Sequence, residues 1–264
     1  FTDASVRTCI LNLNVATQND YNVIFKGIID KEILEQEPGK TFNKQLLKEH
    51  LDNWLSFSSA DANYKTIIDK IKIRDKTIND YFDVSQGLIP YDKYRGHSDF
   101  QIKNRVWHAD VKKDETYKRE LKGGDLRRYD IDWNGSLWIS YGSWLAAPRK
   151  KEYFTNPRVL VREITSDLLY CCYTEIEYYN TPSIINIISN QAIVELKYLL
   201  SILNSKLIGW FHNNVSPKAK KGLFPKILVN DVRSIPIPEI SNEAQQPFIE
   251  RVDIMQSKNK DLRD

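Results

Sequence analysis

Apolar positions near the start of the chain follow two different periods. The runs VRTCILNL at 6–13 and YNVIFKGII at 21–29 are rich in β-branched and apolar residues, which is typical of strands. From Thr41 the apolar positions recur every three or four residues, with lysines and acids between them, up to the serine pair that begins at Ser58. We therefore expect two strands followed by an amphipathic helix.

A second helical stripe covers residues 64–71 and can extend to Ile78. It gives way to the strand-like run YFDVSQGLIP at 81–90, which ends in turn-forming residues. This change of period predicts a module boundary between residues 57 and 75.

The stretch 81–190 consists of short apolar runs separated by glycines and prolines. Its clearest strand candidates are LWISYG at 137–142, RVLVREI at 158–164 and LLYCCYTEIEYY at 168–179. Turn residues between such runs are typical of surface loops. We expect a mainly β module here.

Helical spacing returns after residue 195. Leucines and aromatic residues advance by three or four along 196–211, so one helix should bury Leu203, Leu207 and Phe211. A last helix presents a narrower stripe, made of Phe248, Val252, Met255 and Leu262. The predicted fold class is α+β: a mainly antiparallel or mixed β module with C-terminal helices, preceded by a strand and helix segment.

Composition and cysteine content limit the class of protein to which the chain can belong. The chain has 264 residues, of which 41% are hydrophobic and 28% charged, as in ordinary globular domains. Its three cysteines fit neither a disulfide framework nor a zinc site, and the chain has no signal peptide or long apolar segment. We expect a soluble, cytoplasmic protein with no membrane partner. Because the chain starts without methionine inside a strand-like run, we expect it to be part of a longer protein.

Charge is distributed unevenly along the chain. The net charge is only +3, yet residues 81–230 alone carry +6, and residues 196–230 hold six lysines and no acid. Clustered cations attract polyanions and release their counterions. Nucleic acid is therefore one candidate partner, and a solvated lysine face is the other explanation.

Catalytic motifs are weak in this sequence. The two Glu-x-Lys strings, at 120–122 and 195–197, are found in metal-dependent nucleases, but the second begins a helix, where residues i and i+2 do not face each other. His97-x-Asp99 and His108-x-Asp110 lack further ligands at a metal-binding spacing, so we interpret them as surface turns. No phosphate-binding glycine loop or nucleophile elbow is found. The pattern favours a binding module over an enzyme.

Several segments together resemble a known family. YLLSILNSKLIGWFHNN, a basic loop, FPKILVNDVRSIPIP and a Gln-containing helix follow one another, with INDYFDVSQGLIP, LKGGDLRRYDID and YFTNPRVLVREIT upstream. In this order they resemble the C-terminal specificity, or target recognition, domain of adenine-specific DNA methyltransferases of Type IIG and related Type II restriction-modification enzymes. The similarity spans nearly the whole chain and is strongest from about 78 to 258.

The resemblance implies how the chain is organised. Residues 1–60 would be the end of a methyltransferase domain and a connector, 61–240 the DNA specificity domain, and 241–264 a C-terminal helix. The family's S-adenosylmethionine loop and its Asn/Asp-Pro-Pro-Tyr/Phe motif are missing, since Asn156-Pro157-Arg158 does not match the latter. The chain would bind no cofactor itself. S-adenosylmethionine, and in a cleaving enzyme Mg²⁺, would belong to a prokaryotic parent protein whose catalytic domain is the partner of this module.

The resemblance also implies that two classes of residue contact double-stranded DNA. Lysines would contact phosphates, which positions the duplex without reading its sequence. These are Lys218, Lys220, Lys221, Lys226, Lys150 and Lys151. Base reading needs side chains that pair with base edges in the major groove. Its candidates are Lys93, Arg95, Gln101, Asn104, Arg105, Arg127, Arg128 and Arg149, although each alone is also explained as a solvated side chain.

Arg162 is expected to be structural, and Trp107, Trp133, Trp138, Trp144 and Tyr129 are expected to pack rather than to stack on bases. Two other functions stay open at this point. One is a metal-dependent nuclease that uses the Glu-x-Lys strings and the His/Asp pairs. The other is a protein-interaction subunit of a restriction system.

Overall fold

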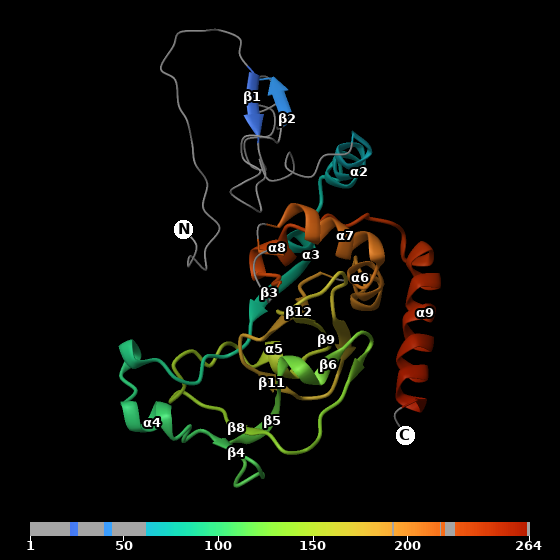
Figure 1. The fold of residues 1–264 in the computed structure, drawn as a ribbon. Helices are drawn as coiled ribbons and strands as arrows, with labels where there is room; N and C mark the ends of the chain where they lie inside the picture. Colours follow the sequence, from blue (N-terminus) through green and yellow to red (C-terminus); the bar gives the residue numbers. More distant parts are fainter. Residues whose placement is uncertain are drawn as a thin grey trace. The chain divides into compact units, whose positions relative to one another are not determined.

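The fold was analysed in a computed structural model of the chain, which describes residues 22–25, 40–43, 62–191, 193–216, 218–219 and 225–262. The chain divides into two compact units, residues 1–70 and 71–264. Figure 1 shows the elements and their labels. The predicted strand at 6–13 lies outside the described residues.

In the first unit the described residues form a short antiparallel pair and most of a helix. Strand β1 (Asn22–Phe25) pairs with β2 (Lys40–Asn43), with Asn22 opposite Asn43, and α2 (Ala62–Lys72) follows. The helix predicted from Thr41 is wrong at its start, because residues 41–43 belong to β2; its remainder, 44–61, is not described. The second predicted helix is confirmed as α2.

A fully antiparallel sheet, which we call the scaffold sheet, forms the centre of the second unit. Its strand order is β10 (Cys171–Thr174), β9 (Arg158–Arg162), β12 (Ile184–Ser189) and β3 (Phe82–Gln86). Helix α3 (Ile78–Tyr81) leads directly into β3, so Ile78 begins a helix of its own. Alternate residues such as Val159, Val161 and Ile187 face one apolar core and are at most 2% exposed. This alternation follows from the two-residue period of a strand.

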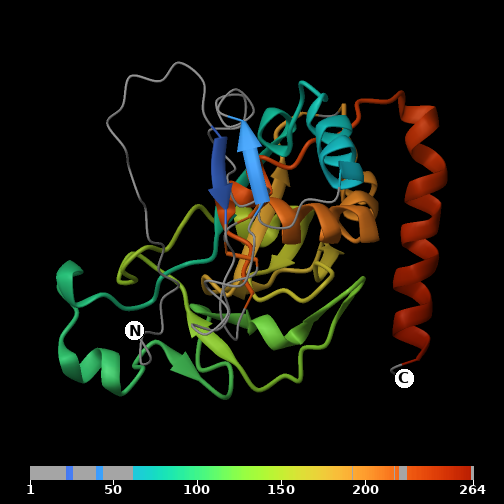
Figure 2. The same ribbon diagram turned by 45° about the horizontal axis from the view of Figure 1, so that its top comes forward.

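Helices cover that core from one side of the scaffold sheet. They are α6 (Leu196–Leu203), α7 (Lys206–Val215), α8 (Val229–Arg233) and α9 (Asn242–Asp261). In Figures 1 and 2, α9 runs along the edge of this unit, beside α6. The helix predicted for 196–211 is therefore two helices.

The break between α6 and α7 has a local cause. Asn204 exchanges side-chain hydrogen bonds with the backbone of Cys171 in β10, and Ser205 caps α7 by accepting a hydrogen bond from the Ile208 N–H. Because α7 is a separate helix, its apolar face does not continue the stripe of α6. Leu203 and Phe211 are buried as predicted, whereas Leu207 is 51% exposed. The prediction that Leu207 is buried is wrong.

In the last helix, Val252 is buried at 1% exposure, but Phe248 and Met255 are 40% and 43% exposed, and Leu262 lies beyond the helix end. Of the four residues predicted to form the narrow apolar stripe, Val252 alone is buried.

A second sheet packs beside the first and is built from much shorter strands. Its order is β11 (Tyr179–Asn180), β5 (Tyr117–Leu121), β8 (Trp138–Ser140) and β4 (His108–Ala109), and only the β11–β5 pair is parallel. A small hairpin, β6 (Leu126–Arg127) with β7 (Asp130–Ile131), lies nearby, as does α5 (Glu152–Thr155). The α+β class with antiparallel and mixed sheets and C-terminal helices is confirmed.

Candidate nucleic-acid interface

Two separate segments of the second unit meet beside the short-strand sheet. Segment 87–110 leaves β3 and carries the 3₁₀ helix η3 (Lys93–Arg95), α4 (Asp99–Lys103) and β4, and it lies against segment 141–151. Ile89 bridges to Ala147, the Arg95 guanidinium donates to the Ala146 carbonyl at 2.6 Å, and His97 Nε2 donates to the Trp144 carbonyl at 2.8 Å. In Figures 1 and 2 the α4 region projects on the side opposite to α9.

The meeting of these segments brings together two clusters that are separate in sequence. We use the name basic face for the exposed or half-exposed cations that these two segments carry. They are Lys93, Arg95, Lys103, Arg105, Arg149, Lys150 and Lys151. Lys93 pairs with Asp99 at 3.0 Å, with both side chains well exposed, and Arg95 approaches Asp92 at 3.7 Å, with the Asp92 side chain half-buried. Exposed pairs of this kind are weak and exchange readily for a stronger anion.

Two arginines of the basic face have an unusual backbone. Arg105 has φ of 48° and Arg149 has φ of 64°, in the left-handed region that non-glycine residues rarely occupy. Such strain persists only when the surroundings impose it, and it gathers at functional sites. Tyr129, at φ of 65°, is the other described non-glycine residue in this region.

Gln101 and Asn104 are already engaged within α4. The Gln101 side chain accepts a hydrogen bond from the Ser98 N–H at 2.8 Å and completes a capping box. Asn104 Nδ2 donates to the Phe100 carbonyl at 2.9 Å. Their local hydrogen bonds explain their presence without a base contact.

Arg127 and Arg128 lie elsewhere, on the β6–β7 hairpin and its turn. Arg127 forms an exposed ion pair with Asp132 at 2.9 Å. Arg128 donates to the Asn204 carbonyl at 2.5 Å, at the C-terminal end of α6, and its guanidinium lies 5.8 Å from the centre of the Tyr129 ring. A cation at a helix C-terminus is stabilising, which gives Arg128 a structural role.

The lysine loop connects α7 to α8, and only part of it is described. Lys218 is exposed, while Lys226 pairs with Glu163 at 3.3 Å; Lys220 and Lys221 lie outside the described residues. His212 of α7 is 4% exposed beneath this loop. Burial lowers the pKa of His212 below its ordinary value, against the opposing effects of the Asp231 carboxylate and a hydrogen bond to the Lys226 backbone.

The tryptophans pack mainly against one another, as expected. Trp107 and Trp144 have ring centres 5.9 Å apart, and Trp133 and Trp138 are 5.4 Å apart in an edge-to-face arrangement. Arg162 lies 5.2 Å from the centre of the Tyr170 ring, in agreement with a structural role.

The His108 motif was misinterpreted from the sequence. His108 is not in a surface turn: it forms part of β4, and its buried side chain lies 3.3 Å from the Glu120 carboxylate of β5. Glu195 and Lys197 do begin a helix, as predicted, since Glu195 occupies the N-cap position of α6. Among the described residues no group of three or more His, Cys, Asp and Glu side chains is arranged to hold a metal ion.

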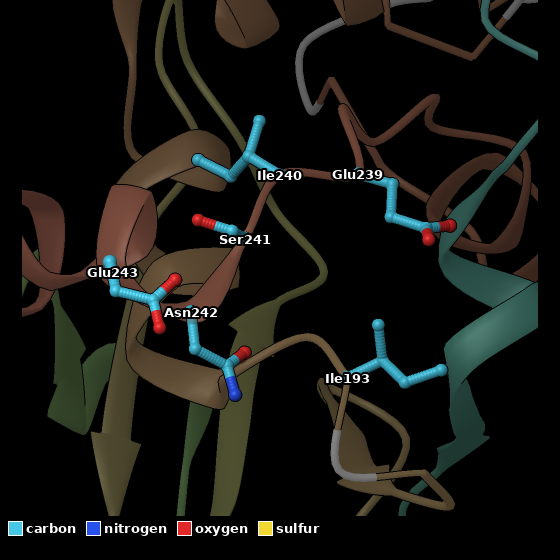
Figure 3. A pocket seen from close by; sticks show the side chains of 6 residues that line it. All are labelled: Ile193, Glu239, Ile240, Ser241, Asn242 and Glu243. Carbon is cyan, nitrogen blue, oxygen red and sulfur yellow. The ribbon is translucent and has the colours of Figure 1, made fainter.

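A hollow of about 430 Å³ lies at the start of α9, where Glu239 and Glu243 are among its lining residues. Figure 3 shows these two side chains on opposite sides of the hollow, with the Glu239 carboxylate directed away from Glu243. Glu239 instead accepts a hydrogen bond from Tyr81, and burial together with this carboxylate raises the pKa of Tyr81 to about 12. The acids here do not form a cation site.

Comparison with known families identifies one segment of the chain. Residues 118–237 match the model of the TaqI-like C-terminal specificity domain. This match confirms the resemblance to specificity domains of restriction-modification enzymes. No curated protein matches the chain. Among the described residues, no helix has the length and apolar character needed to cross a membrane.

The chain is also similar to part of several solved structures. One is the HsdS subunit from Thermoanaerobacter tengcongensis, at 12% identity over 75% of this chain and 44% of that chain, with a TM-score of 0.43. Another is the type IIG restriction endonuclease BpuSI, at 11% identity over 81% of this chain and 30% of that chain, with a TM-score of 0.49. A third is the type IIL restriction-modification enzyme MmeI in complex with DNA, at 9% identity over 71% of this chain and 29% of that chain, with a TM-score of 0.47. The chain thus spans less than half the length of each.

Proposed function

From the premise that residues 118–237 are a specificity domain of the restriction-modification type, we propose that the chain reads a DNA sequence with its basic face. The observation that carries this proposal is the pair Arg105 and Arg149, two exposed or half-exposed arginines in left-handed backbone conformations. They come from segments 44 residues apart in sequence, at a surface rich in further cations.

Geometry divides the candidate residues into two roles. Arg95, Arg105 and Arg149 carry planar guanidinium groups, which can form bidentate pairs with guanine in the major groove. Lys150, Lys151 and Lys218 are exposed point charges suited to phosphate. We assign Lys220 and Lys221 to the same phosphate role. Lys226 contributes less, because Glu163 already neutralises it.

Exposed aromatic residues support nucleic acid as the partner. Tyr94 is 98% exposed and Phe100 is 69% exposed, and both lie among the cations of the basic face. Large apolar side chains inserted into a groove unstack base steps and widen the contact. A purely solvated charged surface would not need them.

The parent protein is part of the same proposal. Residues 1–60 would be the end of a methyltransferase domain, 61–240 the specificity domain and 241–264 a C-terminal helix. A catalytic domain of the same parent would bind S-adenosylmethionine and methylate adenine in the sequence that this module selects. Whether that parent also cleaves DNA with Mg²⁺ is a separate property of its other domains.

Duplex binding at several salt concentrations tests the proposal. If four to six phosphates are neutralised, a plot of log affinity against log salt concentration should have a slope of about −4 to −5. Fluorescence anisotropy of a labelled duplex between 50 and 200 mM salt measures it, in the range where such contacts weaken most visibly. A flat salt response, or no binding at low salt, would contradict the proposal and favour a protein-interaction subunit. Magnesium-dependent cleavage by the chain would favour the nuclease.

A further inference from the structure

One histidine connects the two segments that carry the basic face. The imidazole of His97 contacts two backbone groups: Nδ1 lies 3.0 Å from the Asp92 nitrogen, and Nε2 lies 2.8 Å from the Trp144 carbonyl oxygen. Asp92 belongs to the same turn as His97, whereas Trp144 lies 47 residues further along the chain. The same side chain therefore closes a turn and attaches it to the second segment.

The backbone partners of His97 fix the position of its ring hydrogen. A backbone N–H can only donate, so Nδ1 accepts from Asp92 and carries no hydrogen. A backbone carbonyl can only accept, so Nε2 carries the hydrogen and donates it to Trp144. Both contacts need the same neutral tautomer. An apolar side chain at position 97 would lose both of them.

The turn that His97 closes carries two cations of the basic face. The His97 N–H also donates to the Asp92 carbonyl at 3.4 Å, so residues 92 and 97 are joined through backbone and side chain. Gly96, with φ of 91°, supplies a left-handed conformation that glycine adopts without strain. Lys93 and Arg95 are exposed between the two joined residues. The placement of both cations therefore depends on this closure.

The carbonyl that accepts from His97 is itself well held. Trp144 Nε1 donates to the Ser140 carbonyl at 3.1 Å, and the Trp144 ring lies so close to Gly142 that a Cβ atom there would be 2.3 Å from it. The Leu145 N–H donates to the Gly142 carbonyl at 3.2 Å, which closes the chain around the ring. The turn is thus attached to a fixed point of the second segment.

Further contacts between the two segments lie at the start of the first one. Ile89 and Ala147 exchange backbone hydrogen bonds at 2.8 and 2.9 Å, but these do not reach the turn. The turn itself is attached by His97 and by the Arg95 guanidinium, which donates to the Ala146 carbonyl. An arginine that turns toward a base gives up such a contact. His97 would then still attach the turn.

We propose that His97 is a positioning residue for base reading, because its imidazole holds the turn that presents Lys93 and Arg95. A bidentate pair with a base edge needs a guanidinium fixed in position and direction, whereas a phosphate contact carries no such requirement. Loss of the imidazole should therefore lower selectivity more than overall affinity. The inference rests on the proposed reading of DNA by the basic face and adds to it a residue that contacts no base.

Two variants of position 97 separate the hydrogen bonds from the bulk of the side chain. His97→Gln keeps one acceptor and one donor, so it can form both contacts. His97→Leu fills similar space and can form neither. Asn213→Leu is the matched control, because the Asn213 side chain also donates to a backbone carbonyl 47 residues away, that of Ser166 at 3.3 Å, outside the basic face.

The test uses the whole chain and a randomised library of duplexes. Bound duplexes are sequenced, and the affinities for the enriched duplex and its single-base variants are then measured by fluorescence anisotropy. In His97→Leu we expect discrimination at one position of the site to fall about fivefold, roughly the net value of one hydrogen bond. The salt slope should not change, since the phosphate contacts remain. His97→Gln should recover most of the discrimination, and Asn213→Leu should keep all of it.

Hydrogen exchange of the amides at 92–97 reports the closure of the turn without DNA. It should be faster in His97→Leu than in the unmodified chain or in His97→Gln, at similar melting temperatures. Unchanged discrimination in His97→Leu, or an equal loss in His97→Gln or Asn213→Leu, would overturn the inference and leave base reading by the basic face intact. If the unmodified chain has no sequence preference, the proposed function is wrong, and the positioning role with it.

Discussion

The two sheets of the second unit use their residues in opposite ways. The scaffold sheet has strands of four to six residues, and β9 and β12 are buried along nearly their whole length. The short-strand sheet has strands of two to five residues and buries His108 and Glu120 among its apolar contacts. Long apolar strands fix a fold, whereas short strands leave their connecting segments free to carry polar side chains. We therefore place stability in the first sheet and recognition beside the second.

A buried arginine lies at the junction of the two sheets. Arg158 of β9 is fully buried and donates to the carbonyls of Asn156, Ile176 and Tyr178. Burial lowers its pKa to about 10, so it remains charged at neutral pH. It ties the start of β9 to the chain that leads into β11, and it stabilises the junction of the two sheets mainly through these carbonyl contacts.

The largest expected contrast is in stability. Leu203→Ala should lower the free energy of unfolding by about 2 to 5 kcal/mol, because Leu203 is fully buried in the core over the scaffold sheet. Leu207→Ala, at a position 51% exposed on the next helix, should cost far less. Urea denaturation of both variants measures the difference. Equal losses would mean that the break between α6 and α7 is misplaced.

The next contrast concerns base discrimination by the basic face. Arg105→Asn and Arg149→Asn keep side chains that tolerate the left-handed backbone but lose the guanidinium fork. Each should reduce discrimination at one position of the preferred site by about 1 to 3 kcal/mol. Competition between single-base variants of that site measures this. Arg127→Asn, which removes an exposed arginine from the β6–β7 hairpin, is the control and should leave the preference unchanged.

The sequence predicted the scaffold better than the site. Strands β9 and β10 of the scaffold sheet and the buried residues Leu203 and Phe211 follow from local periodicity, which a single chain displays directly. The neighbouring segments of the basic face do not, because Arg95 meets Ala146 only through tertiary structure.

The same reason explains why His108 was interpreted as part of a turn. Its partner, Glu120, is twelve residues away, and only the pairing of both strands with β8 brings them together. The strand-forming residues around Glu120 were nevertheless a signal in the sequence that β5 lies there.

The sequence also contained a signal for the break between α6 and α7. Ser205, which follows Asn204, is a typical N-cap residue and could have predicted the start of a new helix.

A smaller effect is expected from the lysine loop. Replacing Lys218, Lys220 and Lys221 together by Ala should weaken binding to all duplexes alike and reduce the steepness of the salt dependence by up to about 3. A lysine on a phosphate carries no base information, so the sequence preference should persist. Anisotropy titrations at several salt concentrations test this. Replacing Lys258 and Lys260 of α9 by Ala should leave the slope as it is.

The smallest effect is a pH dependence of stability centred on His212. Because burial lowers the folded-state pKa of this group, the unfolded state binds more protons once the pH falls below the unfolded value of about 6.5. Stability from neutral His212 should therefore be present above that pH and decline below it. Melting temperatures between pH 7.5 and 5.5 should fall less in His212→Gln than in the unmodified chain. Identical slopes would contradict the assignment.

Selection of duplexes from a randomised library tests the central claim most directly. The chain is incubated with the library at moderate salt, and bound molecules are sequenced. We predict that one defined sequence is enriched, that the lysine-loop triple variant enriches the same sequence more weakly, and that the double variant Arg105→Asn and Arg149→Asn loses selectivity within it. Enrichment of no sequence by the unmodified chain, or a changed preference in the lysine variant with none in the arginine variant, would contradict the assignment of base reading to the basic face.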